Sequence, residues 1–153
     1  MTDSKIIRTG IVQRTFNEDV DLNRAANVTA IENLAGDGAD LVVLSELHDS
    51  LYFCQTEDVD NFDLATQLSG EFADIYGAAA ADNSVVLVAS AFERRAPGLY
   101  HNTAVVFDSD GSIAGTEGQV VTVVELTNSG ALARGRGEAV LPAPTSTDTG
   151  EDD

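Results

Sequence analysis

The sequence predicts an α/β domain in which strands and helices alternate along the chain. Short apolar runs rich in β-branched residues alternate with segments whose apolar residues recur every three or four positions, and these are the spacings of strands and helices. The run Leu41-Val42-Val43-Leu44 is apolar throughout, as expected of a strand whose sheet is covered on both faces. Hydrophobic residues make up 43% of the 153 positions, which suffices for one packed domain.

The first three elements are expected between residues 6 and 44. Residues 6–13 predict a strand, and Asn17-Glu18-Asp19 after it is typical of a helix start, where acids complement the helix dipole. The helix is expected to end near Gly36-Asp37-Gly38, and residues 41–44 predict a second strand. One face of the helix is expected to be apolar and buried, and it consists of Leu22, Ala26, Ala30, Ile31 and Leu34.

A second helix and further strands are expected between residues 69 and 114. The helix covers residues 69–83, and a buried strand covers residues 84–92. Residues 100–107 and 112–114 are expected to pair as a hairpin, because Asp110-Gly111 between them is a strong turn-forming dipeptide. The buried face of this helix is expected to contain Phe72, Ile75, Tyr76 and Ala79.

The composition of the chain changes near residue 118. No aromatic residue follows Phe107, and acidic residues become scarce between residues 118 and 147. The last residues, from Gly135 onward, are rich in Thr, Ser, Gly and Pro, as in disordered segments. We therefore expect a partial domain over residues 1–117 and a divergent, disordered tail over residues 118–153.

The charge of the chain excludes some classes of partner. Acidic residues number 26 against 8 basic ones, for a net charge of −18, which disfavours binding to nucleic acid and to anionic membranes. Lys5 is the single lysine, and a surface rich in acid and poor in lysine is typical of proteins that work in concentrated salt. We expect a halophilic origin; the alternative is an acidic protein from ordinary salt.

The sequence also predicts a cytoplasmic location. No apolar run approaches the roughly 18 residues that cross a bilayer. The opening Met1-Thr2-Asp3-Ser4-Lys5 lacks the apolar core of a signal peptide. Cys54 is the one cysteine, so a disulfide within the chain is impossible and a reducing compartment is expected.

The densest candidate site begins at Ser45-Glu46, directly after the strand predicted at residues 41–44. A carboxylate at the carboxyl end of a parallel strand lies where α/β sheets build their sites, and partial burial there suits it to general-base chemistry. The spacing alone is weak evidence, because a glutamate after an apolar strand is more often solvated. The two interpretations stay open on these residues alone.

A longer set of motifs resembles one enzyme family. Between roughly residues 5 and 115 the chain resembles the nitrilase superfamily of carbon–nitrogen hydrolases, and within it the N-carbamoylputrescine amidases. The resemblance is carried by the strand at residues 7–13, Asn23-Arg24-Ala25, Gly38-Ala39-Asp40 with the run through Glu46-Leu47, Leu51-Tyr52-Phe53-Cys54-Gln55-Thr56-Glu57, Asn61-Phe62-Asp63-Leu64-Ala65, Ala89-Ser90-Ala91-Phe92-Glu93, and the segment from Arg94 through Tyr100-His101-Asn102-Thr103 to Val106.

The resemblance implies a fold, a reaction and three site residues. The fold is the nitrilase αββα sandwich, represented here by its N-terminal half. Glu46 matches the general base, Tyr52 is expected to line the substrate pocket, and Asn102 belongs to a pair expected to organise hydrogen bonds beside the active-site strands. The family reaction is hydrolysis of N-carbamoylputrescine to putrescine, carbon dioxide and ammonia. No cofactor is expected, and the partners are a small carbamoyl or amide substrate and further copies of the chain in a homo-oligomer.

The chain departs from the family pattern after Gly115. A lysine motif is expected there, but the sequence reads Thr116-Glu117-Gly118-Gln119, and no cysteine follows Cys54 to act as the nucleophile. The family uses a base, a lysine and a thiolate together, so the chain is expected to be inactive alone. A truncated or frameshifted product accounts for this; the alternatives are a non-catalytic binding module and a subunit of a nitrilase-like assembly.

Two other readings of the same region are weaker. Glu46, His48 and Cys54 together invite interpretation as a nucleophilic trio, but the resemblance places Cys54 in a loop on the substrate side, and a structural or pocket-lining thiol is the simpler interpretation. His48, Asp49 and His101 match no standard metal-ligand spacing. We therefore expect no metal site.

Overall fold

A five-stranded sheet forms the framework of the chain, in the order β1-β2-β3-β4-β5. The computed structural model describes residues 6–55 and 58–121. Strands β1 (Thr9–Ile11), β2 (Leu41–Val43) and β3 (Val86–Ala96) run parallel, whereas β4 (Leu99–Phe107) and β5 (Ile113–Val121) continue the sheet in antiparallel fashion. The parallel part places the end of β2 beside β3, which is where a site is expected.

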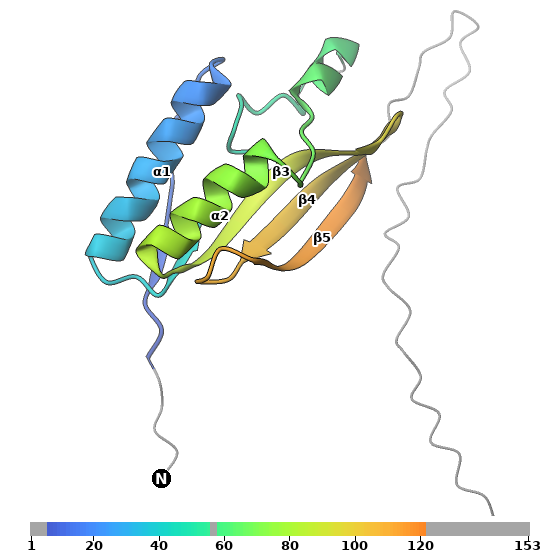
Figure 1. Cartoon of the computed structure of the whole chain (residues 1–153). Helices are drawn as coiled ribbons and strands as arrows, with labels where there is room; N and C mark the ends of the chain where they lie inside the picture. Colours follow the sequence, from blue (N-terminus) through green and yellow to red (C-terminus); the bar gives the residue numbers. More distant parts are fainter. Residues whose placement is uncertain (1–5, 56–57, 122–153) are drawn as a thin grey trace, which may run out of the picture.

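Two helices lie together on one face of this sheet (Figure 1). Helix α1 (Val20–Gly36) begins after Asp19, whose side chain accepts hydrogen bonds from two backbone N–H groups in the first turn. Helix α2 (Glu71–Asn83) ends at Ser84 in the left-handed conformation. A short 3-10 helix, η1 (Val59–Leu64), lies in the long connection between β2 and α2. No described helix is both long and apolar enough to cross a bilayer.

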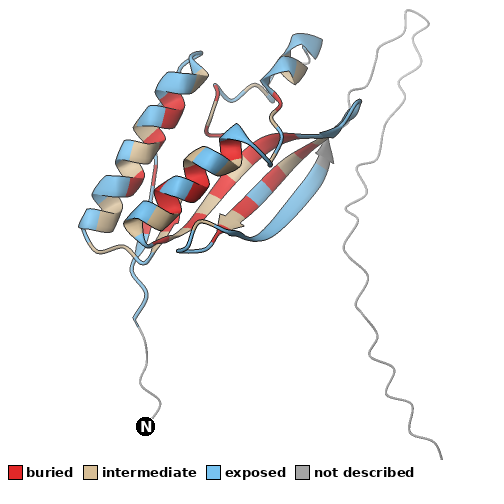
Figure 2. Ribbon diagram, in the orientation of Figure 1, coloured by how far each residue is buried: buried red, intermediate tan, exposed pale blue. Residues whose placement is uncertain are grey.

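The main core fills the space between the helices and the sheet. Its largest members are fully buried, and the buried surfaces of α1 and α2 face the sheet in Figure 2. Leu87, Ala89 and Ala91 alternate along β3 and point to this side, while Ser90 and Phe92 point to the other side. The core consists of Val12, Ile31, Val42, Leu44, Phe72, Tyr76, Ala79, Ala80, Val85, Leu87, Ala89, Ala91, Val105 and Phe107.

Strand β5 is longer than the sequence predicted. It continues to Val121, past the predicted domain boundary at residue 117, because its backbone pairs with β4 along nearly the whole length of that strand. Residues 113–119 are exposed, as fits an edge strand (Figure 2). The predicted tail over residues 118–153 lies outside the described residues except for this strand end, so the domain boundary stays a prediction.

The predicted fold class is confirmed, with one error in how α1 packs. A mixed sheet carries both main helices, as the α/β class predicts. The predicted apolar face of α1 is wrong at Leu22, which is 60% exposed. The residues that α1 buries most deeply are polar with one exception, and they are Asn23, Arg24, Asn27 and Ile31. These polar side chains are buried because they have partners behind the candidate site.

Candidate active site

Glu46 lies three residues beyond β2, in a turn that covers residues 46–49. The turn reverses the chain sharply, and Leu47 adopts a positive φ of 50°, a conformation that is uncommon for a residue with a side chain. Leu47 is buried, and its backbone N–H donates to the Ser90 hydroxyl at 3.1 Å. The strand end and this turn together present Glu46 beside β3 and β4.

The Glu46 carboxylate is held by Asn102. The Asn102 side-chain amide donates a hydrogen bond of 2.5 Å to Glu46 Oε1, across 56 positions of sequence. Asn102 pairs with Phe92 across β3 and β4, so both side chains point to the sheet face opposite the helices. Glu46 itself is exposed, because that face is not covered by described residues around it. The partial burial expected for a general base is therefore absent in the described part of the chain.

Tyr52 and Cys54 lie in the loop that follows the turn. Tyr52 is 51% exposed, and Cys54 is also exposed. The charges of Cys54 and then Glu46 raise the pKa of the Tyr52 hydroxyl, which places all three groups within electrostatic reach of one another. The structure thus brings Glu46, Asn102 and Tyr52 into one neighbourhood.

An apolar cluster adjoins this neighbourhood. Leu47, Ala65 and Phe92 are its buried members. The ring centroids of Phe53 and Phe62 lie 5.0 Å and 5.7 Å from the ring centroid of Phe92. Tyr100 stacks on Phe92 at 5.6 Å. The cluster lies beside the turn that carries Glu46, and it is built from that turn and the loop after it, η1 and its C-terminal flank, β3 and β4.

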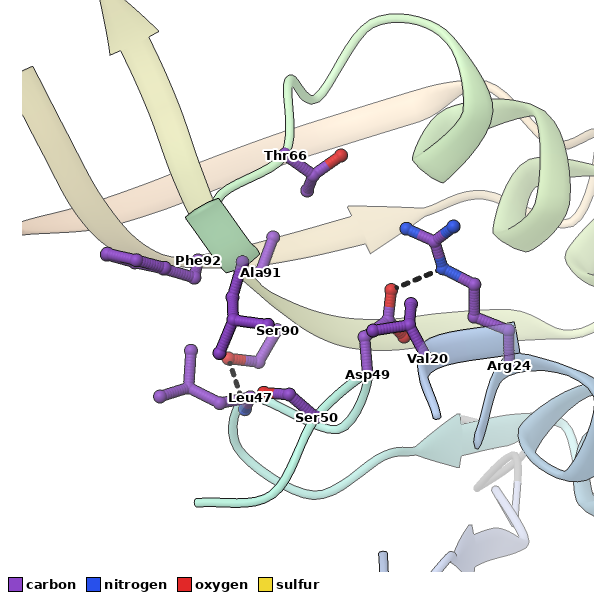
Figure 3. Close-up of a pocket in the computed structure, with 10 residues that line it drawn as sticks. Val20, Arg24, Leu47, Asp49, Ser50, Thr66, Ser90, Ala91 and Phe92 are labelled. Carbon is purple, nitrogen blue, oxygen red and sulfur yellow. Dashed lines mark hydrogen bonds and ion pairs between the residues drawn. The ribbon is translucent and has the colours of Figure 1, made fainter. Parts of the chain in front are cut away.

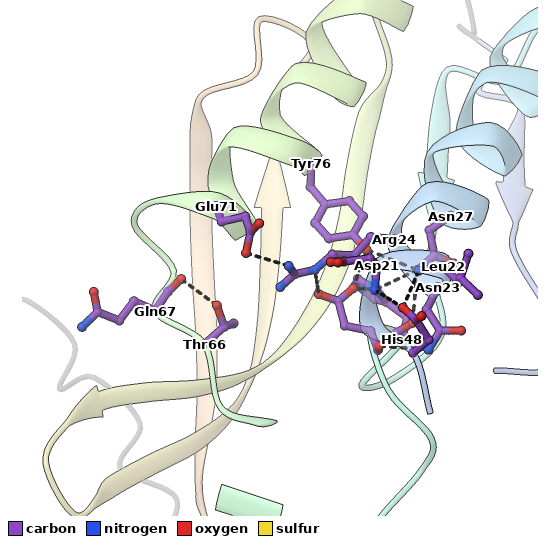
Figure 4. Close-up of polar contacts among 12 residues, drawn as sticks. Asp21, Leu22, Asn23, Arg24, Asn27, His48, Thr66, Gln67, Glu71 and Tyr76 are labelled. Carbon is purple, nitrogen blue, oxygen red and sulfur yellow. Dashed lines mark hydrogen bonds and ion pairs between the residues drawn. The ribbon is translucent and has the colours of Figure 1, made fainter. Parts of the chain in front are cut away.

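A buried polar network supports the turn from the helix side (Figure 4). The Asp49 carboxylate accepts from the Tyr76 hydroxyl at 2.5 Å, from Arg24 Nε at 2.8 Å and from His48 Nδ1 at 2.9 Å. Burial raises the pKa of Asp49, but the hydrogen bonds from His48, Tyr76 and Arg24 outweigh it and hold that pKa below its ordinary value. Arg24 also pairs with Glu71 at 2.8 Å.

Asn27 completes the network. Its amide nitrogen lies within hydrogen-bond distance of the His48 backbone oxygen at 3.1 Å, of the Tyr76 hydroxyl at 3.2 Å and of His48 Nδ1 at 3.2 Å. His48 Nδ1 lies 2.9 Å from Asp49 Oδ1 and 3.1 Å from the Tyr76 hydroxyl. The other ring nitrogen, Nε2, is buried without a hydrogen-bond partner among the described residues. The network ties α1 and α2 to the turn directly after Glu46.

A small cavity lies between this network and β3 (Figure 3). Its volume is about 30 Å³, room for very few water molecules and far below the several hundred Å³ of a ligand pocket. Arg24, Asp49 and Ser50 line one side, and Ser90, Ala91 and Phe92 line the other. This cavity is therefore too small for a small-molecule ligand.

The residues considered for metal binding are used otherwise. His48 and Asp49 pair with each other inside the network. His101 lies on β4 beside Glu93, whose carboxylate accepts two hydrogen bonds from Arg95 and one of 2.6 Å from Thr103. Within the part of the chain that the structure describes, no group of three or more His, Cys, Asp and Glu side chains is arranged to hold a metal ion.

Sequence reasoning missed several residues around the site. Ser90, Asn27 and Asp49 have long-range contacts that no local spacing reveals. One available indication was the motif Asn23-Arg24-Ala25 in the family resemblance, since Asn23 and Arg24 are buried although neither belongs to the predicted apolar face.

The chain is similar to known carbon–nitrogen hydrolases. The family model described as carbon–nitrogen hydrolase matches residues 8–140. Citrullinase from Francisella tularensis is 34% identical over 110 residues, which cover 71% of this chain and 38% of that protein. A crystal structure of a carbon–nitrogen hydrolase from Helicobacter pylori superimposes with a TM-score of 0.69 at 39% identity, covering 74% of this chain and 39% of that one.

A more distant structure agrees in fold. The superfamily member XC1258 from Xanthomonas campestris has a TM-score of 0.63 at 24% identity. This chain thus spans well under half the length of these relatives. The family match and these relatives show that the chain belongs to the carbon–nitrogen hydrolase family.

Proposed function

We propose that this chain supplies the base-bearing part of a hydrolase that cleaves the terminal ureido group of N-carbamoylputrescine. The contact between Glu46 and Asn102 at the end of β2 is the observation that carries this proposal. The overall reaction adds water to R–NH–CO–NH₂ and releases the amine R–NH₂, carbon dioxide and ammonia. Glu46 would act as the general base, and Tyr52 and Asn102 would contribute to the substrate-binding surface.

The role of Glu46 follows from its surroundings. A general base must accept a proton while its carboxylate is held in one orientation, and the Asn102 amide provides that orientation through one oxygen. No described residue donates a hydrogen bond to the second oxygen, which would be available to a nucleophile. Because the carboxylate is exposed on the sheet face away from the helices, a nucleophile and a substrate can approach it from that side.

We propose that the isolated chain does not turn over this substrate. Attack on a ureido carbon by this family's route needs a thiolate and a cation for the developing oxyanion. Cys54 and Lys5 are the only cysteine and lysine in the sequence. Cys54 lies in the loop beside Tyr52, on the substrate side, and Lys5 precedes β1 in sequence, so neither matches the family's later positions.

The activity of the isolated chain is measured as ammonia release from N-carbamoylputrescine in concentrated KCl. We expect background release only. Release that disappears in Glu46→Gln but persists in Cys54→Ser would contradict the proposed inactivity and require a mechanism without a thiol.

The role of Glu46 is tested in a chimera. Residues 8–117 of this chain replace the matching segment of the Helicobacter pylori enzyme, which keeps the rest of its own chain. Glu46→Gln is expected to lower ammonia release by about 100-fold or more, the usual contribution of a general base. Glu32→Gln makes the same chemical change on the exposed side of α1 and should have no effect. Equal activity of the two variants would refute the role of Glu46.

Citrulline is the second candidate substrate, because the curated relative at 34% identity is a citrullinase. Citrulline and N-carbamoylputrescine share the terminal ureido group and differ at the far end, where citrulline carries an amino acid group. The ratio of kcat/KM values for the two compounds in the chimera distinguishes them. A higher value for citrulline would replace N-carbamoylputrescine as the proposed substrate.

The remaining parts of the proposal concern the oligomeric state, the adaptation to salt and the cellular location. The chain would form a homo-oligomer or pair with another chain of the family, and native mass spectrometry in volatile salt reports the mass of the complex. A non-catalytic binding module is the alternative if the chimera is inactive. A halophilic origin and a cytoplasmic location are supported by the net charge of −18 and by the single cysteine.

A further inference from the structure

Ser90 lies at the centre of a closed set of contacts around Glu46. Its hydroxyl accepts a hydrogen bond of 3.1 Å from the Leu47 backbone N–H (Figure 3). The same hydroxyl donates to Asn102 Oδ1 at 3.3 Å. Asn102 in turn donates to Glu46 at 2.5 Å, and Glu46 is the chain neighbour of Leu47. The four residues therefore form a ring that begins and ends at the Glu46-Leu47 peptide.

The donor and acceptor roles within this ring allow one arrangement. A serine hydroxyl has a single proton, and the Leu47 N–H has no choice but to donate. The Ser90 proton then points to another acceptor, and among the described residues Asn102 Oδ1 accepts it at 3.3 Å. With its oxygen turned to Ser90, the Asn102 amide presents its NH₂ group to the Glu46 carboxylate.

We propose that Ser90 is a positioning residue, which fixes the orientation of the Asn102 amide and so aims an N–H group at Glu46. The two ends of an amide have almost the same shape, so packing does not determine which of them faces Glu46. Without the Ser90 hydroxyl, the amide can rotate by half a turn. Its oxygen would then face the carboxylate, and repulsion would replace attraction.

Ser90 also supports the turn that carries the base. Leu47 has a positive φ of 50°, a strained conformation for a residue with a side chain. Its N–H is satisfied by Ser90, and its side chain is buried in the apolar cluster around Phe92. One hydroxyl thus holds both the backbone after Glu46 and the amide that contacts Glu46.

The functional importance of these four contacting residues rests on the proposed role of Glu46 as the base. Their hydrogen bonds can nevertheless be tested without measuring turnover of a substrate. The probe is the pair of side-chain NH₂ protons of Asn102, observed by ¹H–¹⁵N NMR on the full chain in KCl and assigned by their loss in Asn102→Ala. An amide proton that is hydrogen-bonded to a carboxylate resonates downfield of an amide proton without such a bond. Glu46→Gln should remove this downfield shift and thereby show that the signal reports the contact.

Ser90→Ala is expected to remove the same downfield shift, because the amide is no longer held in one orientation. Ser90→Thr keeps a hydroxyl and should retain the shift. Ser45→Ala is the matched control: Ser45 is the direct neighbour of Glu46, but its hydroxyl donates to the Val12 backbone oxygen at 3.0 Å and should leave the signal unchanged. An unchanged Asn102 signal in Ser90→Ala, with the shift lost in Glu46→Gln, would overturn the proposal.

A second variant covers the case in which Ser90→Ala does not fold, as judged by far-UV circular dichroism. Ser90→Cys has a similar shape and a weak donor, so partial loss of the downfield shift is expected and full retention would overturn the proposal. The signal is measured without substrate. A chimera that needs no Glu46 for ammonia release would therefore refute the proposed function and leave the role of Ser90 intact.

Discussion

The Tyr76 hydroxyl donates a hydrogen bond of 2.5 Å to Asp49 Oδ1 and thereby joins helix α2 to the turn that carries Glu46. The same hydroxyl accepts from Asn27 on α1 at 3.2 Å. Three elements that are far apart in sequence thus meet at one oxygen atom, which is fully buried with its ring. Stability and the geometry of the site are therefore coupled through this residue.

Tyr76→Phe should destabilise the chain by about 1 to 3 kcal/mol, because Asp49 and Asn27 each lose one buried hydrogen-bond partner. Tyr100→Phe makes the same change in a ring that packs on Phe62 and Phe92 and has no hydroxyl hydrogen bond among the described contacts. That variant should change the free energy of unfolding by less than about 0.5 kcal/mol. Urea denaturation in constant KCl measures both; equal losses would show that the Tyr76 hydroxyl contributes nothing.

Asp49 should make the chain less stable in acid. Its pKa is lower in the folded state than in the unfolded state, so the folded state binds the proton less readily. The resulting stabilisation is complete above the ordinary carboxyl pKa of about 4 and is lost as the pH falls through the lower, folded value. In Asp49→Asn the free energy of unfolding should be lower near neutral pH, and its decrease below pH of about 4 should be shallower.

Asp63→Asn serves as the control for this experiment, because Asp63 is exposed at the end of η1. Its profile of unfolding free energy against pH should follow that of the parent chain. If Asp49→Asn also followed the parent profile in acid, the hydrogen bonds to Asp49 would not account for the acid sensitivity.

Two glycines on the helices should respond to alanine in opposite directions. A Cβ atom on Gly77 would lie 2.7 Å from the backbone oxygen of Gly111, so helix α2 and the β4–β5 turn would have to separate. Gly77→Ala should therefore cost about 1 to 3 kcal/mol despite the better helix propensity of alanine. Gly36→Ala, at the open end of α1, meets no atom within 4 Å and should stabilise the chain by up to about 1 kcal/mol. Thermal unfolding that ranks the two variants in the reverse order would contradict the close contact.

The elements of this fold were largely predictable from local patterns. Apolar periodicity and turn residues located both main helices and the hairpin at Asp110-Gly111, because these signals act over a few residues. The inward face of α1 was not predictable in this way. Leu22 is exposed and Asn27 is fully buried, since the face is selected by polar partners on α2 and on the turn after β2.

The candidate site was predictable only in part, for a similar reason. Glu46 followed from its position after an apolar strand and from the family resemblance, and Asn102 followed from the resemblance alone. Ser90 is a small polar residue inside a strand and has no local signature. Its role depends on contacts 12 and 43 positions away, which exist only once β3 pairs with β4 and the turn folds back.

Cys54 should behave as an ordinary exposed thiol. It is exposed in the loop beside Tyr52, and a thiol that serves as a nucleophile would need a lowered pKa. Alkylation by iodoacetamide at neutral pH should proceed within a few-fold of the rate for a model thiol, and Cys54→Ser should leave the Asn102 amide signal unchanged. Much faster alkylation would indicate an activated thiol and reopen the interpretation of Cys54 as a nucleophile.

Concentrated KCl should be required for full structure. Of the charged residues, 26 are acidic and 8 basic, so like charges repel across the surface at low ionic strength. Exposed acids also lie close together in sequence, as with Asp58, Asp60 and Asp63 around η1. The screening length decreases from about 10 Å at 0.1 M salt to about 3 Å at 1 M, so added salt removes repulsion between all but the nearest pairs.

Far-UV circular dichroism against KCl concentration measures this dependence, with sorbitol at matched osmolality as the control for effects that do not involve charge. We expect the helical signal and the unfolding temperature to rise with KCl well beyond their rise in sorbitol.

A charge variant separates screening from other salt effects. Asp58→Asn, Asp60→Asn and Asp63→Asn together remove three negative charges from the net −18 and should lower the KCl concentration needed for folding. A chain that is already fully structured in dilute buffer, and that gains no more from KCl than from sorbitol, would refute the proposed adaptation to salt. The acidic composition would then have no effect on folding.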